Sequence, residues 1–372
     1  MMSKEKRRVP KLRFPGFTED WEQRKFKDIA FKRGKISEAD LPYVEFEDIN
    51  SGIGTLNKNI SQKVGHKKGL LFEAGDVLFG KLRPYLQNWL LCQFAGIAVG
   101  DFWVLQPQNV SSAFLYYLIQ SEAYQSVANI SSGTKMPRSS WPLVSETLFS
   151  IPKYKEANMI GEFFLLIDRT ITLHQRKLNN LKLKKKALLQ KLFPKNEERY
   201  PELRFPGFTD AWEQRKLGSL ATVEMNKRIF KEQTTIKGDI PFYKIGTFGS
   251  DADSFISREL FKEYKNKYPY PNIGDILISA SGSIGRTVVY NGEDAYYQDS
   301  NIVWLNHNGK IDNSFLLQFY NQVKWAGLEG STIKRLYNKN ILETNIALPK
   351  IEEQRLIGKF FELVDRSITL HQ

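Results

Sequence analysis

The sequence predicts α/β (α+β) globular domains, two in tandem, separated by long helices that form an antiparallel coiled coil, with a pseudo-twofold internal repeat. Three observations predict this fold. Two segments of the first half recur in the second half, at offsets of 191 and 197 residues. One of them has apolar residues at steps of three and four, which is typical of a coiled-coil helix. The length of 372 residues allows two or three domains at about 150 residues each.

Each half of the chain consists of two blocks that recur in the other half, which we call the frame, and of a segment between them that differs between the halves, which we call the body. Residues 12–25 return at 203–216 with 12 of 14 positions identical, and both copies contain Leu-Arg-Phe-Pro-Gly-Phe-Thr followed by Trp-Glu-Gln-Arg-Lys. Residues 151–175 return at 348–372 with 15 of 25 positions identical, including Ile-Gly-x-Phe-Phe and Ile-Thr-Leu-His-Gln. Two halves with one frame and different bodies indicate two similar tasks on two different ligands.

The bodies between the repeated blocks share only short landmarks, such as Gly-Asp-Val-Leu at 75–78 beside Gly-Asp-Ile-Leu at 274–277. The domain boundaries therefore follow the repeated blocks. We assign residues 1–151 to the first globular domain, 152–194 to the first spacer helix, 195–348 to the second globular domain and 349–372 to the second spacer helix.

The spacer helices carry a coiled-coil seam. The first helix spans roughly 55 Å at 1.5 Å per residue, and we expect the second to pair with it. Because the second copy ends at residue 372, we expect a truncated second helix that leaves 178–192 unpaired within the chain.

His174 and its counterpart His371 fit a polar seam residue that sets register better than a catalytic group. The apolar seam residues are Ile160, Phe164, Ile167, Ile171, Leu178, Leu181, Leu188 and Leu192 in the first helix, and Ile357, Phe361, Val364 and Ile368 in the second.

The chain is basic, with 54 Lys and Arg against 41 Asp and Glu and a formal charge of +13. This balance suggests a polyanionic partner such as nucleic acid, although a basic surface without consequence is an equal alternative from charge alone. The lysine-rich end of the first spacer helix is either a solvated face or a surface for DNA or an acidic partner. Its lysines are Lys182, Lys184, Lys185, Lys186 and Lys191.

Several classes of protein are excluded. No run of 18 apolar residues is present, and the basic N-terminus runs into Pro10 instead of an apolar stretch, which argues against a membrane span and a secretory signal. The single cysteine, Cys92, excludes an internal disulfide and a multi-cysteine zinc site. We therefore expect a soluble, cytoplasmic protein.

The sequence contains no complete catalytic or metal-binding motif. The four histidines include no His-x-x-x-His pair. Residues 75–81 imitate the start of a phosphate loop, but Leu82 follows where a hydroxyl residue would hold magnesium. A metal-dependent nuclease site needs carboxylates and a lysine, which Asp253, Glu263 and Lys265 could supply. Their spacing is loose, and such a combination arises by chance in a chain with this many charged residues. We predict no catalytic residue and no metal site.

Two pairs of loops have the chemistry of DNA contacts. One pair directly follows an apolar strand in each half, and the other precedes the second repeated block. Singly, each residue is more often a solvated surface cation. Recurrence at matching places makes contacts to guanine edges or phosphates an equal alternative to a solvated surface. The candidates are Lys81, Arg83, Tyr85, Lys135 and Arg138 in the first half, and Ser281, Ser283, Arg286, Lys334 and Arg335 in the second.

The doubled arrangement of Leu-Arg-Phe-Pro-Gly-Phe…Trp-Glu, a variable body and Ile-Gly-x-Phe-Phe…Leu-His-Gln resembles the specificity (S) subunit of type I restriction-modification systems over the whole chain. The resemblance implies that the two bodies are target recognition domains, each reading one half of a bipartite, asymmetric site on double-stranded DNA. It implies that the coiled coil sets the unread spacing and docks two methyltransferase (M) subunits, which restriction (R) subunits join.

The resemblance also implies a non-catalytic chain in a complex that is an adenine-N6 DNA methyltransferase and ATP-dependent endonuclease. S-adenosylmethionine, ATP and magnesium then belong to the partner subunits, and this chain binds no cofactor. Two linked readers can each be weak while the pair is selective. The alternatives are a free-standing nuclease or methyltransferase, which the absent motifs disfavour, and a scaffold, which leaves two divergent bodies unexplained.

Overall fold

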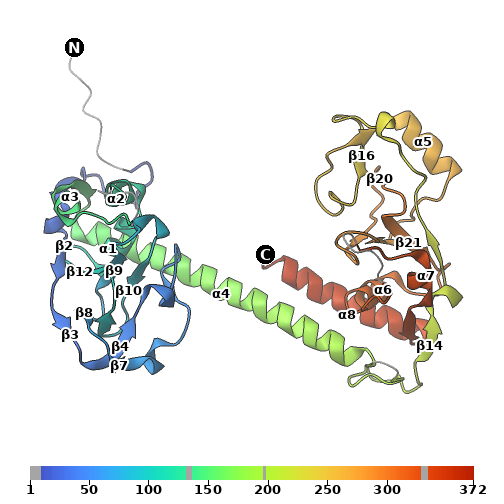
Figure 1. The fold of residues 1–372 in the computed structure, drawn as a ribbon, viewed down its shortest axis with the longest axis horizontal. Coiled ribbons are helices and arrows are strands. Elements are labelled where there is room, and N and C mark those ends of the chain that lie inside the picture. Colours follow the sequence, from blue (N-terminus) through green and yellow to red (C-terminus); the bar gives the residue numbers. More distant parts are fainter. Residues whose placement is uncertain (1–9, 131–135, 196–197, 328–333) are drawn as a thin grey trace, which may run out of the picture. The chain divides into compact units, whose positions relative to one another are not determined.

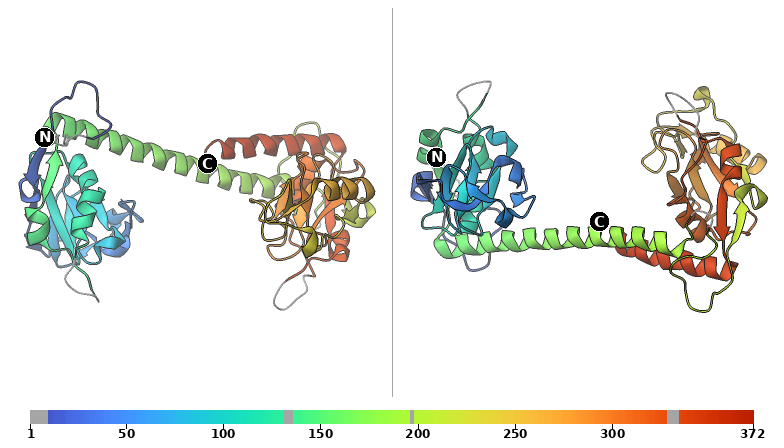
Figure 2. Two further views of the ribbon diagram at one scale, coloured as in Figure 1. Left: turned by 90° about the horizontal axis from the view of Figure 1, so that it is seen from above. Right: turned by 60° about the horizontal axis from the view of Figure 1, so that its bottom comes forward.

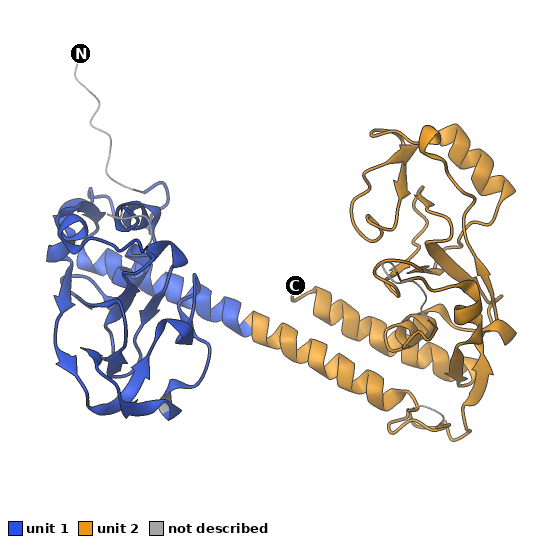
Figure 3. Ribbon diagram, viewed as in Figure 1, with its two compact units in different colours: residues 1–173 blue, residues 174–372 orange. Residues whose placement is uncertain are grey.

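The computed structural model describes residues 10–130, 136–195, 198–327 and 334–372. The chain forms two compact units, unit 1 (Met1–Leu173) and unit 2 (His174–Gln372), which Figure 3 distinguishes by colour. Both contain sheets and helices, so the expected tandem α/β organisation is confirmed. The boundary between the units falls inside the long helix and not at either of its ends.

Unit 1 is built on two sheets (Figure 1). One is a four-stranded antiparallel sheet in the order β10-β9-β12-β2, and the other is a five-stranded sheet in the order β3-β8-β11-β4-β7 in which β11 and β4 are parallel. Two further pairs are β1-β13 and β5-β6. The strands are β1 (Glu22–Lys25), β2 (Ala30–Arg33), β3 (Ile36–Ser37), β4 (Asp40–Val44), β5 (Ile49–Asn50), β6 (Thr55–Leu56), β7 (Val64–His66), β8 (Gly69–Phe72), β9 (Val77–Gly80), β10 (Trp89–Leu91), β11 (Gly96–Ala98), β12 (Phe102–Pro107) and β13 (Leu148–Ile151).

Among the described residues of unit 1, three short helices complete its body. They are α1 (Ser112–Leu118), α2 (Glu122–Ala128) and α3 (Trp141–Glu146). The first begins where the Ser111 hydroxyl accepts a hydrogen bond from the Phe114 backbone N–H at 3.2 Å. Apolar side chains of α1 and α2 pack with β9 and β12 in one continuous core. Cys92, in a second core, is buried.

Unit 2 has a four-stranded antiparallel sheet in the order β15-β21-β18-β19, a three-stranded sheet in the order β17-β16-β20, and the pair β14-β22. Its strands are β14 (Glu213–Lys216), β15 (Thr222–Glu224), β16 (Ile240–Tyr243), β17 (Phe255–Ile256), β18 (Ile276–Ser279), β19 (Thr287–Val289), β20 (Tyr296–Tyr297), β21 (Ile302–Asn306) and β22 (Asn345–Leu348). Its helices within the body are α5 (Arg258–Lys267), α6 (Asn313–Tyr320) and α7 (Asn338–Glu343).

The two divergent bodies share one central sheet. The order β19-β18-β21-β15 of unit 2 repeats the order β10-β9-β12-β2 of unit 1, with antiparallel pairing throughout. The short Gly-Asp landmark lies at the turn before the buried central strand in each unit. Gly75 and Gly274 have left-handed φ angles of 91° and 94°, and the next side chains, Asp76 and Asp275, accept backbone hydrogen bonds that close these turns.

The repeated block forms α4 (Tyr154–Leu192) and α8 (Ile351–Thr369). Each carries one glycine where it crosses another helix closely. A Cβ on Gly161 would lie 2.6 Å from the backbone nitrogen of Phe114 in α1, and a Cβ on Gly358 would lie 2.9 Å from that of Phe315 in α6. The Ile-Gly-x-Phe-Phe motif therefore contains glycine because only a residue without a side chain allows this approach.

Each repeated frame is held by an ion pair between its two blocks. Arg13 donates two hydrogen bonds, of 2.6 and 2.8 Å, to Glu156 at the start of α4. Arg204 donates two, both of 2.8 Å, to Glu353 at the start of α8. Both carboxylates are 1% exposed, and such bidentate pairs combine charge with fixed geometry. This explains the arginine of the Leu-Arg-Phe motif.

The helices pair as an antiparallel coiled coil within unit 2, where α8 lies beside the C-terminal half of α4 (Figure 2). Lys185, which follows the seam residue Leu181 by four positions, lies 2.6 Å from Asp365 of α8, and the rings of His174 and His371 are 5.9 Å apart. The residue numbers of the paired positions decrease along α4, from 185 to 174, as they increase along α8, from 365 to 371, so the two helices are antiparallel. The histidine contact is consistent with a polar pair in the seam.

The expectation that 178–192 is unpaired is wrong. Leu188, Leu189 and Leu192 pack with Ile357 and Phe361 in the main core of unit 2. The N-terminal half of the α4 seam is the more exposed part, with Phe164 at 44% and Ile171 at 48%. The apolar spacing is the same along the whole helix, so spacing alone does not reveal which half α8 covers.

The two copies of the frame tryptophan pack differently. Trp212 is fully buried and contacts Phe193 at the end of α4, with ring centroids 5.8 Å apart. Its counterpart Trp21 is half-buried and lines a cavity of 400 Å³ with Phe163 and Phe164. The end of α4 therefore completes the core of unit 2.

Candidate nucleic-acid interface

The two predicted loop sets of unit 1 meet after the central strand β9. The backbone N–H of Arg83 donates to the carbonyl oxygen of Pro137 at 2.7 Å, and that of Ser139 donates to Lys81 at 2.9 Å. Leu82 and Arg138 form an isolated antiparallel bridge between the two loops. We call residues 81–88, 136–139 and Asp101 loop cluster 1.

Unit 2 repeats this arrangement with different side chains. Ser281 and Arg335 form the corresponding isolated bridge, and the backbone N–H of Leu336 donates to the carbonyl oxygen of Ala280 at 2.8 Å. We call residues 280–286, 334–336 and Asn301 loop cluster 2. The bond from Leu336 matches the bond from Ser139 in unit 1, so an equivalent bridge and backbone hydrogen bond bring the paired loops together in both units.

Asp101 and Asn301 occupy matching places that sequence reasoning missed. Asp101 immediately precedes β12 and its carbonyl oxygen accepts from the Lys81 N–H at 2.9 Å; Asn301 immediately precedes β21 and its carbonyl oxygen accepts from the Ala280 N–H at 2.7 Å. The available signal was an Asp or Asn before an apolar strand in each half, as Gly-Asp-Phe and Ser-Asn-Ile. Strand order, not sequence, places these residues beside the loops.

Loop cluster 1 concentrates charge around one carboxylate. Arg138 donates to Asp101 from Nε at 3.2 Å and from Nη2 at 2.9 Å, and Lys81 Nζ lies 3.4 Å from the same carboxylate. Burial alone would raise the pKa of Asp101, but hydrogen bonds and attraction from the two cations lower the pKa below its ordinary value. Asp101 is therefore ionised at neutral pH.

The tip of loop cluster 1 has an uncommon backbone. Arg83 and Gln87 have φ angles of 50° and 56°, a left-handed conformation in which residues other than glycine are strained. Between them Tyr85 is 57% exposed. Arg83, Tyr85 and Gln87 are all exposed, so this tip presents a cation, an aromatic ring and an amide to solvent. Strained backbone positions recur at binding and catalytic sites.

The candidates of unit 2 differ in accessibility. Ser281 is 5% exposed, and its hydroxyl donates to Asn301 at 2.6 Å, so this side chain supports the loop. Arg286 Nη1 donates to the carbonyl oxygen of Phe248 at 2.6 Å, while Ser283 and Lys334 are exposed. Lys135 of unit 1 lies outside the described residues.

Unit 2 carries a further basic and aromatic surface on α5, a helix that has no counterpart among the described helices of unit 1. Lys227 and Lys267 lie over the ring of Tyr268 at 5.1 and 5.6 Å, and Lys265 lies 4.7 Å from that of Tyr270. The run Lys-Glu-Tyr-Lys-Asn-Lys-Tyr over 262–268 was the available signal. Such cation–aromatic groups suit contacts with a nucleic-acid backbone.

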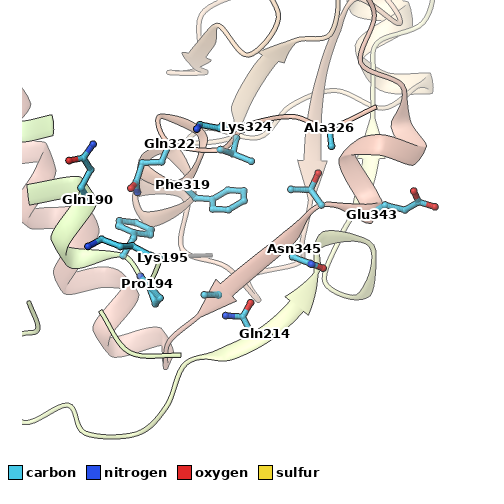
Figure 4. Close-up of a pocket in the computed structure, with 14 residues that line it drawn as sticks. Gln190, Pro194, Lys195, Gln214, Phe319, Gln322, Lys324, Ala326, Glu343 and Asn345 are labelled. Atoms are coloured by element: carbon cyan, nitrogen blue, oxygen red, sulfur yellow. The ribbon is translucent and has the colours of Figure 1, made fainter. Parts of the chain in front are cut away.

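Two observations bear on metal chemistry among the residues that the structure describes. No group of three or more His, Cys, Asp or Glu side chains that could hold a metal is found there. Asp253, considered above for a nuclease site, pairs with Lys244 at 2.8 Å. A cavity of 760 Å³ in unit 2 lies between the end of α4, α6 and β22 (Figure 4), and none of the loop-cluster residues lines it. Within the described part of the chain, no helix has the length and hydropathy of a membrane span.

One sheet built twice, with a polar loop cluster after the same strand each time, defines a protein with two tandem units of one fold on one chain. Comparison with known proteins identifies the family. The model of the type I restriction modification DNA specificity domain matches residues 18–183 and again 209–372. The chain belongs to this family and contains two copies of its domain.

Individual relatives agree with this assignment. S.HindORF215P of Haemophilus influenzae is 54% identical over 158 residues, which is 41% of this chain and 41% of that protein, so the match spans less than half of that relative. The type I restriction enzyme MjaVIII specificity subunit of Methanocaldococcus jannaschii is 22% identical over an alignment that covers 96% of this chain and 88% of that protein.

Solved structures share the fold. The S subunit of a type I restriction-modification system from M. genitalium aligns with a TM-score of 0.60 at 15% identity, covering 98% of this chain and 94% of that one. A chain from a structure of type I restriction-modification complex assembly aligns with a TM-score of 0.54 at 20% identity, covering 97% and 93%.

Proposed function

We propose that this chain selects the DNA site of a type I restriction-modification complex by reading a bipartite, asymmetric sequence. Unit 1 reads one half-site through loop cluster 1 and unit 2 reads the other through loop cluster 2. The observation that carries this proposal is the repeated backbone arrangement of the two clusters with different side chains. One scaffold with two side-chain sets suits one kind of ligand with two sequences.

The charge of the chain supports DNA as the ligand. The formal charge of +13 favours a polyanion, and the sequence-independent part of DNA affinity comes from phosphate contacts by Lys and Arg. Both clusters add arginines that can donate to base edges. Two readers on one chain then multiply their selectivity by linkage, as in other two-site binders.

The remaining roles follow the family. The α4 and α8 coiled coil sets the unread spacing and docks two methyltransferase subunits, with restriction subunits joining the complex. The chain itself performs no chemistry. Adenine-N6 methylation and ATP-dependent cleavage, with S-adenosylmethionine, ATP and magnesium, belong to the partner subunits.

The test is a comparison of genomic methylation. N6-methyladenine is mapped in cells that carry this gene with its neighbouring methyltransferase gene, and in cells that lack only this gene. The expected result is a split, non-palindromic motif that is present only in the first cells. A shared or absent motif, with the methyltransferase expressed, contradicts the proposal and favours a scaffold.

Isolated proteins provide a second readout. The chain and its methyltransferase partner are mixed with DNA that carries the mapped motif, and binding is measured at several salt concentrations. We expect tighter binding to the motif than to a duplex of the same length with one half-site scrambled. Equal affinity for both duplexes would contradict sequence reading by this chain.

A further inference from the structure

Arg138 is held in one orientation by Asp101. The carboxylate oxygen Oδ2 accepts both from Nε, at 3.2 Å, and from Nη2, at 2.9 Å. Asp101 is itself fixed, because its backbone carbonyl oxygen accepts from the Lys81 N–H and its side chain is only 29% exposed. The flexible arginine side chain is thereby restricted before any ligand arrives, which lowers the entropy cost of binding.

The held guanidinium keeps donors available for a ligand. An arginine has five N–H groups, and Asp101 uses one on Nε and one on Nη2. Both Nη1 protons and one Nη2 proton stay on the end of the group, and the side chain is 50% exposed. Two parallel end-on donors match the O6 and N7 acceptors of guanine in the major groove.

The matching arginine of unit 2 lacks this restraint. Arg335 Nη2 has a single long contact of 3.4 Å with the amide oxygen of Asn301, and that oxygen already accepts from Ser281 at 2.6 Å. Among the residues that the structure describes, no carboxylate lies within 4.0 Å of its guanidinium. Arg335 is therefore less restrained than Arg138, and a cation without a fixed orientation suits a phosphate contact without base preference.

We propose that Asp101 is a positioning residue that aims Arg138 at a guanine of the half-site read by unit 1, and that Arg335 contacts phosphate. This inference rests on the function proposed above. The residue before β12, Asp101, thereby makes Arg138 a reader of a base, whereas the residue before β21, Asn301, leaves Arg335 without that role.

The experiment uses the complex of the full chain with its methyltransferase subunits. The Asp101→Asn variant keeps the size and the backbone hydrogen bonds of this position but removes the charge that holds Arg138. We expect the preference for guanine at one base pair of one half-site to fall about tenfold in methylation of a library with randomised half-sites. The other half-site stays unchanged.

Arginine variants provide matched controls. Arg138→Lys keeps the charge but cannot donate in a bidentate manner, so it should lose preference at the same base pair, and Asp101→Asn should have no further effect on top of it. Arg335→Lys should leave base preference unchanged at both half-sites. Circular dichroism of each variant confirms that it is folded.

The outcomes separate this inference from the proposed function. If the wild-type complex shows no split motif, the proposed function itself fails. If the motif is present but Asp101→Asn leaves every base preference unchanged, only the inference fails. The same holds if neither half-site contains guanine, or if Arg335→Lys changes base preference as strongly as Arg138→Lys.

Discussion

The repeat allows one side chain to be tested in two environments. Phe361 and Phe164 occupy the same position of the Ile-Gly-x-Phe-Phe motif, 197 residues apart. Phe361 is fully buried in the core that joins α8 to the end of α4, whereas Phe164 is 44% exposed and contacts the ring of Tyr117 at 5.1 Å. Substitution of each by alanine should therefore have different effects.

The expected magnitudes follow from burial. Phe361→Ala removes a fully enclosed ring and leaves a cavity, which lowers the free energy of unfolding by about 3 to 5 kcal/mol. Phe164→Ala removes a ring that is already partly in water and leaves an open surface. Its cost is the transfer free energy of the buried part alone, about 1 kcal/mol. Leu363→Ala, on an α8 residue that is 60% exposed, is a control expected to change stability by less than about 0.5 kcal/mol.

The assay is native-state hydrogen exchange in urea, read by mass spectrometry for peptides of each unit separately. Separate reading is needed because two compact units need not unfold together. Phe361→Ala should reduce protection across α8 and the C-terminal half of α4 without changing unit 1. Equal losses for Phe361→Ala and Phe164→Ala would refute the argument that α8 covers only the C-terminal half of the seam.

Three further predictions test the frame and the cores. Gly161→Ala places a Cβ 2.6 Å from the backbone nitrogen of Phe114 in α1. The unfolding free energy of unit 1 should fall by about 1 to 3 kcal/mol, with a lower melting temperature. An unchanged melting curve would contradict the close crossing of the two helices. Glu353→Ala leaves Arg204 without its buried partner and should lower the free energy of urea unfolding of unit 2 by about 3 kcal/mol. Asp210→Ala breaks an exposed ion pair and should have no measurable effect. Similar losses for both variants would be inconsistent with the burial of Glu353. Burial raises the pKa of Tyr116 to about 12, so its neutral form stabilises the fold below pH 10 and this contribution is lost as the pH rises through 10 to 12. Because the chain has 16 tyrosines, the absorbance at 295 nm is compared between the wild type and Tyr116→Phe. The difference should appear only near pH 12, and a difference that is complete at pH 10.5 would disagree.

The repeat and the helical spacing were readable from the sequence because both are local patterns. Two blocks that recur at offsets of 191 and 197 residues, largely unchanged, predict two units of one fold, and apolar steps of three and four predict a seam. The paired loops were also predictable, because each follows the same apolar strand. Ser281 shows the limit of this reasoning: its residue type suits a phosphate contact, but the fold buries it against Asn301.

Other features depend on which distant segments meet. The seam of α4 has the same spacing in both halves, so only the antiparallel placement of α8 decides that Leu188 and Leu192 are covered while Phe164 is exposed. Likewise, Asp101 and Arg138 are 37 residues apart and meet because β9 and β12 are neighbours in the sheet. Local patterns determine elements and their faces, since both depend on residue spacing. The pairing of faces and of single polar side chains is decided by the tertiary structure, because it depends on long-range strand order and helix docking.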